Sequence, residues 1–153
     1  MFSALLLANV AATWFMAGVI WFVQLVHYPL MSLVGTERWR AYEEAHCRWT
    51  SYVVIPAMSI ELATGLALAA FALEGPEACA GLPAWALHLG AALTAFIWLS
   101  TFFLQVPLHM RLDARFDVAA HRRLVQTNWL RTLAWSARAG LVTWLLADGV
   151  TLD

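Results

Sequence analysis

The chain has 153 residues, of which 62% are apolar and only 12% are charged, and its formal net charge is −1. An ordinary soluble domain carries about 25% charged residues, so this composition argues against a water-soluble protein. The near-zero charge also argues against a nucleic-acid partner, and the high apolar content argues against disorder. The class that remains is an integral membrane protein, whose first partner is the lipid bilayer.

Four apolar stretches, residues 2–26, 49–73, 83–108 and 127–147, predict the fold. Each is 21 to 26 residues long, close to the ~20 residues that cross a bilayer as a helix. No repeat or long linker divides the chain, so we expect residues 1–153 to form one all-α domain, a transmembrane four-helix bundle.

The arginines predict the orientation of this bundle. All nine cationic residues are Arg, and eight of them lie in or beside the first and third connections, whereas the second connection and the C-terminal segment carry only acids. We call the side of the first and third connections the arginine end and the other side the terminal end. The positive-inside rule places the arginine end in the cytoplasm, so we expect an inner-membrane protein with both termini outward.

Local signals predict how the helices begin and bend. Thr36 and Glu37 have the character of a helix start, and residues 36–48 are amphipathic, so we expect a cytoplasmic interfacial extension before the second span. Asp117 should cap the fourth helix, and Pro56 and Pro107 should kink theirs. Cys47 and Cys79 fall at opposite ends and cannot pair, and neither lies in a CxxC or other metal-ligand spacing.

Four of the five histidines are predicted to reach one level at the arginine end. Gln24 and His27 are three residues apart, Gln105 and His109 are four apart, and His121, Asn128 and Trp135 step by seven along one stripe. Imidazoles at the ends of bundle helices can bind a metal ion or haem. The expected ligands of iron, copper, zinc or haem b are His27, His46, His109 and His121. The alternative is that these are interfacial residues without a shared site, as we expect for His88.

Two ionisable residues, Glu61 and Arg138, fall near the midplane when residues are counted from the helix entries. An isolated charge there costs at least ~2.5–3.5 kcal/mol, so such residues normally face the bundle interior and pair. We expect Glu61 to pair with Arg138, with Arg131 as the competing partner. The pair has either a functional or a purely architectural role.

The nine Trp residues divide into two predicted groups. Trp39, Trp49, Trp85 and Trp129 fall at the expected interfaces, whereas Trp14, Trp98 and Trp135 lie deep enough to line a cavity or to pack in the core. An aromatic pocket would suit a flat apolar substrate or a porphyrin. No GxGxxG, Walker, HExxH, GxSxG or CxxCH motif occurs, which disfavours nucleotide, zincin, hydrolase and c-type haem chemistry.

The junction of the third and fourth spans resembles a known family. The run Gln105-Val-Pro-Leu-His109, a charged loop, and then Thr127-Asn-Trp-Leu-Arg-Thr132 are similar to the small four-helix membrane proteins that include the anthrone oxygenases. That family tends to show Asn-Val-Pro-Leu-Asn and Trp-Asn-x-x-Arg-Thr, so Gln105, His109 and Thr127 depart from its pattern. A fainter similarity, in residues 13–18 and 121–128, is to bacterial four-helix protoporphyrinogen oxidases, whose first-helix histidine has no counterpart here.

Both resemblances imply a membrane oxidoreductase that acts on a flat apolar or aromatic molecule. In this interpretation His27, His46 and His109 bind a metal or haem or move protons, while Glu61, Asn128 and Arg131 orient substrate or supply charge. One alternative is a small transporter or channel subunit that uses Glu61 and Arg138 as an intramembrane relay. Another is a structural protein. Either a monomer or a homo-oligomer is compatible with the sequence.

Overall fold

The computed structural model describes residues 1–150 and shows helices joined by short connections, with no strand in that range. The first long helix comprises α1 (Phe2–Phe22), the π-helical segment η1 (Val23–His27) and α2 (Tyr28–Met31). The second is α3 (Trp39–Glu74). The third comprises α4 (Ala84–Ser100), the π-helical segment η2 (Thr101–Gln105) and α5 (Val106–Ala114), and the fourth is α6 (Val118–Val150).

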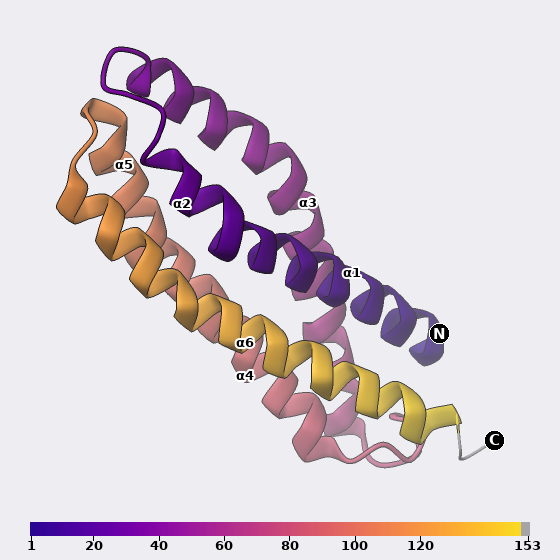
Figure 1. Cartoon of the computed structure of the whole chain (residues 1–153). Helices are drawn as coiled ribbons and strands as arrows, with labels where there is room; N and C mark the ends of the chain where they lie inside the picture. The colour runs from indigo at the N-terminus through magenta and orange to yellow at the C-terminus, as the bar shows by residue number, and fades with distance from the viewer. Residues whose placement is uncertain (151–153) are drawn as a thin grey trace.

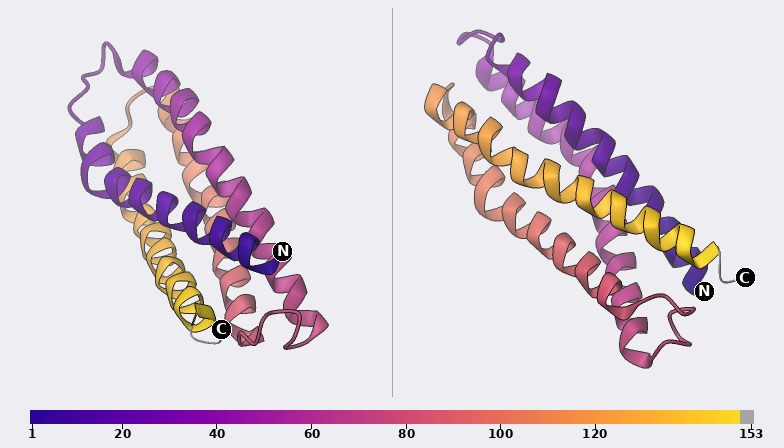
Figure 2. Two further views of the ribbon diagram at one scale, coloured as in Figure 1. Left: turned by 90° about the vertical axis from the view of Figure 1, so that its right-hand side faces the viewer. Right: turned by 60° about the horizontal axis from the view of Figure 1, so that its bottom comes forward.

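The four long helices form an antiparallel up-and-down bundle (Figures 1 and 2). The N-terminus, the end of α6 and the connection from α3 to α4 lie at one end, and the other two connections lie at the opposite end. Helix α1 packs against α3 and α6, and α4 packs against the same two helices. The predicted all-α four-helix architecture is therefore confirmed.

Three of these helices are long and apolar enough to cross a membrane: Phe2–Met31, Trp39–Glu74 and Ala84–Ala114. Length and composition are thus those of an integral membrane protein. Helix α6 lacks a comparably apolar window among the described residues, because it carries Arg131 and Arg138. Both arginines are buried in the bundle, at 7% and 2% exposure, so the polarity of α6 faces protein.

Helix α3 begins later than its sequence predicts. Residues 36–38 form a turn after Gly35, whose φ is +80°, and the helix starts at Trp39 without a side-chain cap. The prediction that Thr36 starts the helix is therefore wrong. From Trp39 the helix is continuous for 36 residues through Pro56, about 54 Å at 1.5 Å per residue. It does not change direction before the second span, because Trp39 and Glu43 are buried against the bundle.

The two π-helical segments each end two residues before a proline. The Tyr28 amide bonds to the Val23 carbonyl and the Val106 amide to the Thr101 carbonyl, each five residues back, and Pro29 and Pro107 follow. Proline has no amide hydrogen and clashes with the carbonyl four residues earlier. The wider π turn accommodates this defect, so the helix continues beyond Pro29, where the sequence predicts a connection. Single π turns are frequent at functional sites.

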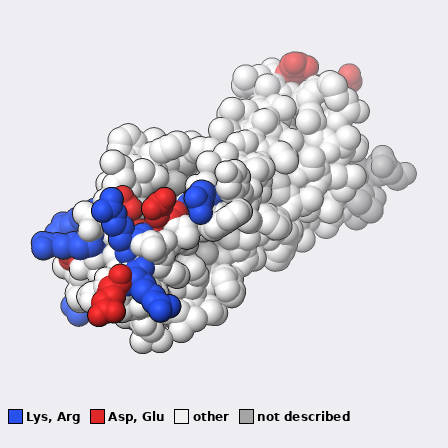
Figure 3. All heavy atoms as spheres, turned by 90° about the horizontal axis from the view of Figure 1, so that it is seen from above, with Lys and Arg blue, Asp and Glu red and all other residues white. Residues whose placement is uncertain are grey.

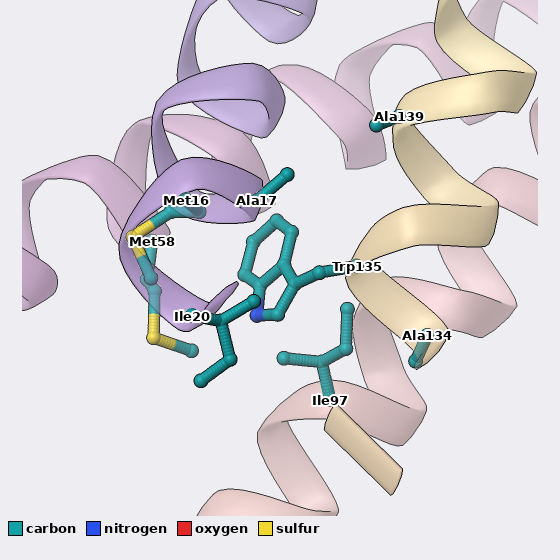
Figure 4. Close-up of a cluster of buried hydrophobic side chains, with 8 residues drawn as sticks. All are labelled: Met16, Ala17, Ile20, Met58, Ile97, Ala134, Trp135 and Ala139. Carbon is teal, nitrogen blue, oxygen red and sulfur yellow. The ribbon is translucent and has the colours of Figure 1, made fainter. Parts of the chain in front are cut away.

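The bundle interior alternates apolar and polar layers. The central apolar layer surrounds Trp135, which is fully buried against side chains from all four helices (Figure 4). Its other buried members are Met16, Ala17, Ile20, Met58, Ile97, Ala134 and Ala139. Trp135 therefore packs in the core, the alternative to lining a cavity. Trp14 is 53% exposed, so the prediction that it lines a cavity is wrong.

Charge gathers at the arginine end of the bundle. Figure 3 shows the basic side chains clustered with acidic ones at this end, whereas only acidic groups are visible at the far end. Between the two ends, large apolar side chains face outward, among them Phe22, Phe103 and Leu133. Trp39, predicted to lie in an interfacial belt, is instead buried, and its Nε1 donates a hydrogen bond to the Leu112 carbonyl.

Candidate functional site

A buried ion pair joins α3 to α6 near the middle of the bundle. Arg138 Nε donates to Glu61 Oε1, and the two side chains are 3% and 0% exposed. Thr94 Oγ1 donates to the same carboxylate oxygen at 2.7 Å, and Arg138 Nη2 donates to Asn9 Oδ1 at 3.1 Å. The amide of Asn9 in turn donates to the Glu61 carbonyl. Glu61 and Arg138 are thus partners, and side chains from all four helices meet at the pair.

Two glycines make room for the Arg138 guanidinium. A Cβ atom at Gly90 would lie 2.4 Å from Nη1, and one at Gly65 would lie 2.9 Å from Nη2. A water-sized cavity lined in part by Asn9, Gly65 and Gly90 adjoins the guanidinium. No sequence signal distinguished these glycines from other small residues in the spans. Their close approach to Arg138 holds α3, α4 and α6 together around one charge.

The pair does not share a site with the histidines. The central apolar layer around Trp135 separates them, because its members other than Ala139 fall between the pair and the arginine end on each helix. Glu61 was predicted to act with Asn128 and Arg131, which lie on the other side of that layer. Their separation favours an architectural role for Glu61 and Arg138.

A second polar layer lies just beyond Trp135. The Asn128 amide donates to Gln24 Oε1 at 2.9 Å, and Arg131 Nη1 donates to Asn128 Oδ1 at 3.3 Å. Arg131 Nε is buried without a hydrogen-bond partner among the described residues, and the arginine forms no ion pair there. Arg131 is therefore a buried cation with free donor capacity, which can stabilise an anion or a developing negative charge.

Gln24 and His27 do not face the same neighbour, contrary to their spacing in a regular helix. Gln24 bonds to Asn128 and to the Val125 carbonyl of α6, whereas His27 faces α3. The π-helical segment η1 contains both residues and changes the angle between them. His27, which the sequence predicts to face inward beside Gln24, therefore contacts His46 on α3 instead.

The imidazoles of His27 and His46 lie at one end of an apolar surface groove. His27 Nε2 and His46 Nδ1 are 2.9 Å apart and share a hydrogen bond, and Thr50 Oγ1 lies 3.1 Å from the same His46 nitrogen. The groove runs between α1 and α3 and has a volume of about 480 Å³. Its lining is almost entirely apolar and includes Gly18, Phe22, Trp49 and Val53. The groove opens on the outer surface of the bundle, where the exposed side chains are apolar.

A third group connects α2, α3 and α5 next to this pair. His109 Nδ1 lies 2.6 Å from Glu43 Oε1, and its Nε2 lies 3.1 Å from the Tyr28 hydroxyl. Glu43 is fully buried, and its Oε2 has no partner among the described residues. Cys47 Sγ lies 3.6 Å from Glu43 Oε1. The ring centroids of His46 and His109 are 5.3 Å apart, so the two groups form one cluster.

The other two histidines lie apart from this cluster. His121 Nε2 bonds to the Tyr28 carbonyl at 2.8 Å, and its ring contacts Phe116. This histidine therefore ties α6 to α2, although the sequence predicts it to be a fourth ligand. His88 is exposed near the terminal end.

Glu43, Cys47 and Tyr42, whose ring stacks on those of His27 and His46, are members of the cluster that were not predicted from sequence. Glu43 precedes His46 by three residues and Cys47 by four, a spacing that brings them to one face of a helix. This spacing is the sequence signal that could have predicted a shared site for Glu43, His46 and Cys47. It was obscured because residues 36–48 were expected to lie along the membrane surface.

Outside the spans, Asp117 caps α6 as predicted. Its Oδ1 accepts hydrogen bonds from the amides of Ala119 and Ala120 at 2.9 and 3.0 Å, and Arg111 bonds to Oδ2. The amide of Ala120, with Arg111 and the amide of Ala119, holds the pKa of the Asp117 carboxyl below its usual value. The start of α6 is thus fixed electrostatically at the arginine end.

The fold and these sites together define an all-helical membrane-type bundle with two separate buried polar centres. No family model, curated protein or solved structure matches the chain.

Proposed function

We propose that this protein is a membrane oxidoreductase that takes a flat apolar or aromatic molecule from the bilayer into the groove between α1 and α3. The observation that carries the proposal is that this apolar groove ends on the hydrogen-bonded pair of His27 and His46. Small-molecule sites commonly have volumes of ~300–1,000 Å³, an apolar lining and a few polar groups at one end. The groove, at about 480 Å³, has these properties.

The histidine cluster supplies acid–base chemistry in this proposal. Oxidation of a phenol or of an activated C–H bond releases a proton as electrons pass to an acceptor, which is dioxygen in the oxygenase-like reaction that the resemblance implies. His27 lines the groove and accepts that proton, and its bond to His46 allows the proton to be passed on. His109 and Glu43 lie beside His46 and extend the network of proton acceptors.

Orientation and localisation belong to the same proposal. The arginine end faces the cytoplasm, α6 spans the membrane with the other three helices, and the first two turns of α3 extend beyond the hydrocarbon. The asymmetry of Arg supports this orientation. The length of α3 supports the extension, because ~54 Å exceeds the ~30 Å hydrocarbon core.

The alternative of an intramembrane relay through Glu61 and Arg138 has less support. Asn9, Thr94, Gly65 and Gly90 enclose the pair, and the adjoining cavity is only water-sized. Close packing from all four helices favours a role in holding the bundle together.

Filling the groove tests the proposal. Gly18 lies in its lining, and a Cβ there would meet no heavy atom within 4 Å; the same is true of Gly140 on α6. Both glycines are exposed. Gly18→Leu should therefore occupy the groove without disturbing the packing, and Gly140→Leu is a matched control.

The measurement is binding of a fluorescent flat aromatic probe to purified protein in lipid nanodiscs, followed by oxygen uptake with an anthrone. Gly18→Leu should weaken probe binding at least about tenfold, equivalent to ~1.4 kcal/mol, and Gly140→Leu should not. His27→Ala should retain binding but abolish oxygen uptake, whereas His88→Ala should retain both. Equal binding by both glycine variants would show that the groove is not the site.

A further inference from the structure

The side chains of Glu43, Cys47 and His109 converge at the arginine end, beside the groove but not in its lining. One ligand atom from each lies within 4.8 Å of the other two, and the structure has no other such group of three among its described residues. Glu43 and Cys47 are one helical turn apart on α3, and His109 comes from α5. Two helices therefore present an oxygen, a sulfur and a nitrogen ligand to one point.

We propose that Glu43, Cys47 and His109 form a binding site for one divalent transition-metal ion of the class of Zn²⁺ and Fe²⁺. The donor set selects this class, since thiolate and imidazole favour such ions over Mg²⁺ or Ca²⁺, and a carboxylate is compatible with them. Three protein ligands leave a coordination position open, as in catalytic rather than structural sites. This proposal does not depend on the ligand of the groove.

The distances suit coordination after a small adjustment. Ligand atoms around a tetrahedral ion with bonds of about 2.0–2.3 Å lie about 3.3–3.7 Å apart. The Cys47 sulfur is already 3.6 Å from Glu43 Oε1. His109 Nδ1 is 2.6 Å from the same oxygen, so these two atoms must separate by somewhat less than 1 Å.

Burial and charge also point to a cation. Glu43 is fully buried and its Oε2 has no partner in the described part of the chain. Glu43 forms no ion pair there except with His109. Binding of the ion would release the Cys47 thiol proton to solvent and place two negative ligands around a charge of +2, which leaves a neutral centre. The His109 side chain is 16% exposed, so an ion has access from the arginine end.

Tyr28 completes the arrangement around His109. With Nδ1 on the metal, His109 would donate its Nε2 proton to the Tyr28 hydroxyl, which lies 3.1 Å away. Metal-bound histidines almost always donate their second N–H in this way, and loss of that partner typically costs 10–100-fold in affinity. Haem b is less suitable, because His27 and His46 bond directly to each other and Trp39, Leu112 and Met31 fill the adjacent interior.

The test uses full-length protein purified in detergent, treated with chelator and titrated with Co²⁺ and Zn²⁺. We expect one equivalent of ion per chain and, with Co²⁺, a near-ultraviolet thiolate-to-metal charge-transfer band. Cys47→Ser should abolish the band, and Cys79→Ser should retain it, since Cys79 is buried at the terminal end. His109→Ala should lose affinity at least about tenfold, His88→Ala should not, and Tyr28→Phe should weaken binding by about 10-fold.

Circular dichroism and size-exclusion chromatography establish that each variant is folded. If Cys47→Ser does not fold, Cys47→Ala and displacement of Co²⁺ by Zn²⁺ from wild-type protein answer the same question. Wild-type protein that binds less than about 0.1 equivalent of either ion overturns the proposal. A charge-transfer band that survives in Cys47→Ser, or that disappears in Cys79→Ser, also overturns it.

Discussion

Removing one partner of the Glu61 and Arg138 pair should destabilise the bundle more than removing both. Arg138→Met leaves the fully buried Glu61 carboxylate with Thr94 as its remaining side-chain donor. Glu61→Gln leaves the Arg138 guanidinium without a counterion, with Asn9 as its remaining side-chain acceptor. In the double variant no charge is stranded, and an unbranched methionine can occupy the space between Gly65 and Gly90.

The magnitude follows from the burial of the two groups. Breaking a buried pair by removing one partner typically costs ~3–5 kcal/mol, which corresponds to a loss of roughly 6–20 °C in Tm for a chain of this size. The double variant loses neutral and charge-assisted hydrogen bonds worth about 1–3 kcal/mol in total. The coupling energy between the two substitutions should therefore be at least ~3 kcal/mol, with the double variant more stable than the sum of the single losses.

Thermal unfolding in a fixed detergent, followed by circular dichroism, measures this cycle. Arg123→Met is the matched control, because Arg123 is exposed at the arginine end and an exposed substitution should change stability by no more than ~0.5 kcal/mol. If the losses in Glu61→Gln and Arg138→Met simply add in the double variant, the two residues are not energetic partners and the reasoning from burial is wrong.

Three further predictions concern the packing, the orientation and the cap. Gly90→Ala should lower the free energy of unfolding by ~1–3 kcal/mol, because its Cβ would lie 2.4 Å from Arg138 Nη1; Gly140→Ala should be neutral or stabilising, and equal shifts in Tm would contradict this. In a background lacking both native cysteines, an impermeant thiol reagent applied to intact spheroplasts should label Glu77→Cys and should label Glu37→Cys only after permeabilisation; the reverse pattern would invert the orientation. Because the pKa of Asp117 is lowered on folding, its stabilisation is present above the unfolded pKa of about 3.9 and is lost as the pH falls through the folded value. Asp117→Asn should thus be less stable than wild type at pH 7 and equally stable in acid. The measurement is Tm across that pH range, and a difference in Tm that does not change with pH would contradict the prediction.

The orientation test uses introduced cysteines because the native ones are unsuitable reporters. Cys79 is 1% exposed, and its Sγ contacts the Leu82 carbonyl at 3.1 Å. Cys47 is partly covered beside Glu43. Glu37 and Glu77 are both exposed, in opposite connections of the bundle, so labelling at these positions reports on the side of the membrane rather than on burial.

Several features of the protein depend on local sequence and were predictable for that reason. The number of helices follows from apolar runs of sufficient length, and the cap of α6 follows from an Asp directly before the helix. The similar depth of Glu61 and Arg138 follows from residue counts, since each residue of a helix advances it by ~1.5 Å. The Arg asymmetry likewise follows from which connections carry charge.

The direction in which each side chain points was decided only by the tertiary structure. Lipid and bundle core are equally apolar, so a spanning helix carries little amphipathic signal to separate its outer face from its inner face. Trp14 and Trp135 both fall well inside predicted spans, yet one is exposed and the other is at the centre of the core. The π turn before Pro29 then rotates His27 toward α3 and away from Gln24, which residue spacing in a regular helix does not reveal.

The two polar centres show the same division. Arg138 needed a counterion wherever it was buried, but Asn9, Gly65 and Gly90 became its neighbours only because three other helices pack at that level. Glu43 precedes the predicted second span, yet it is fully buried because the first turns of α3 belong to the same continuous helix and pack against α5. Contacts between segments more than 60 residues apart, such as Glu43 with His109, depend on how the helices pack, and no local pattern contains that information.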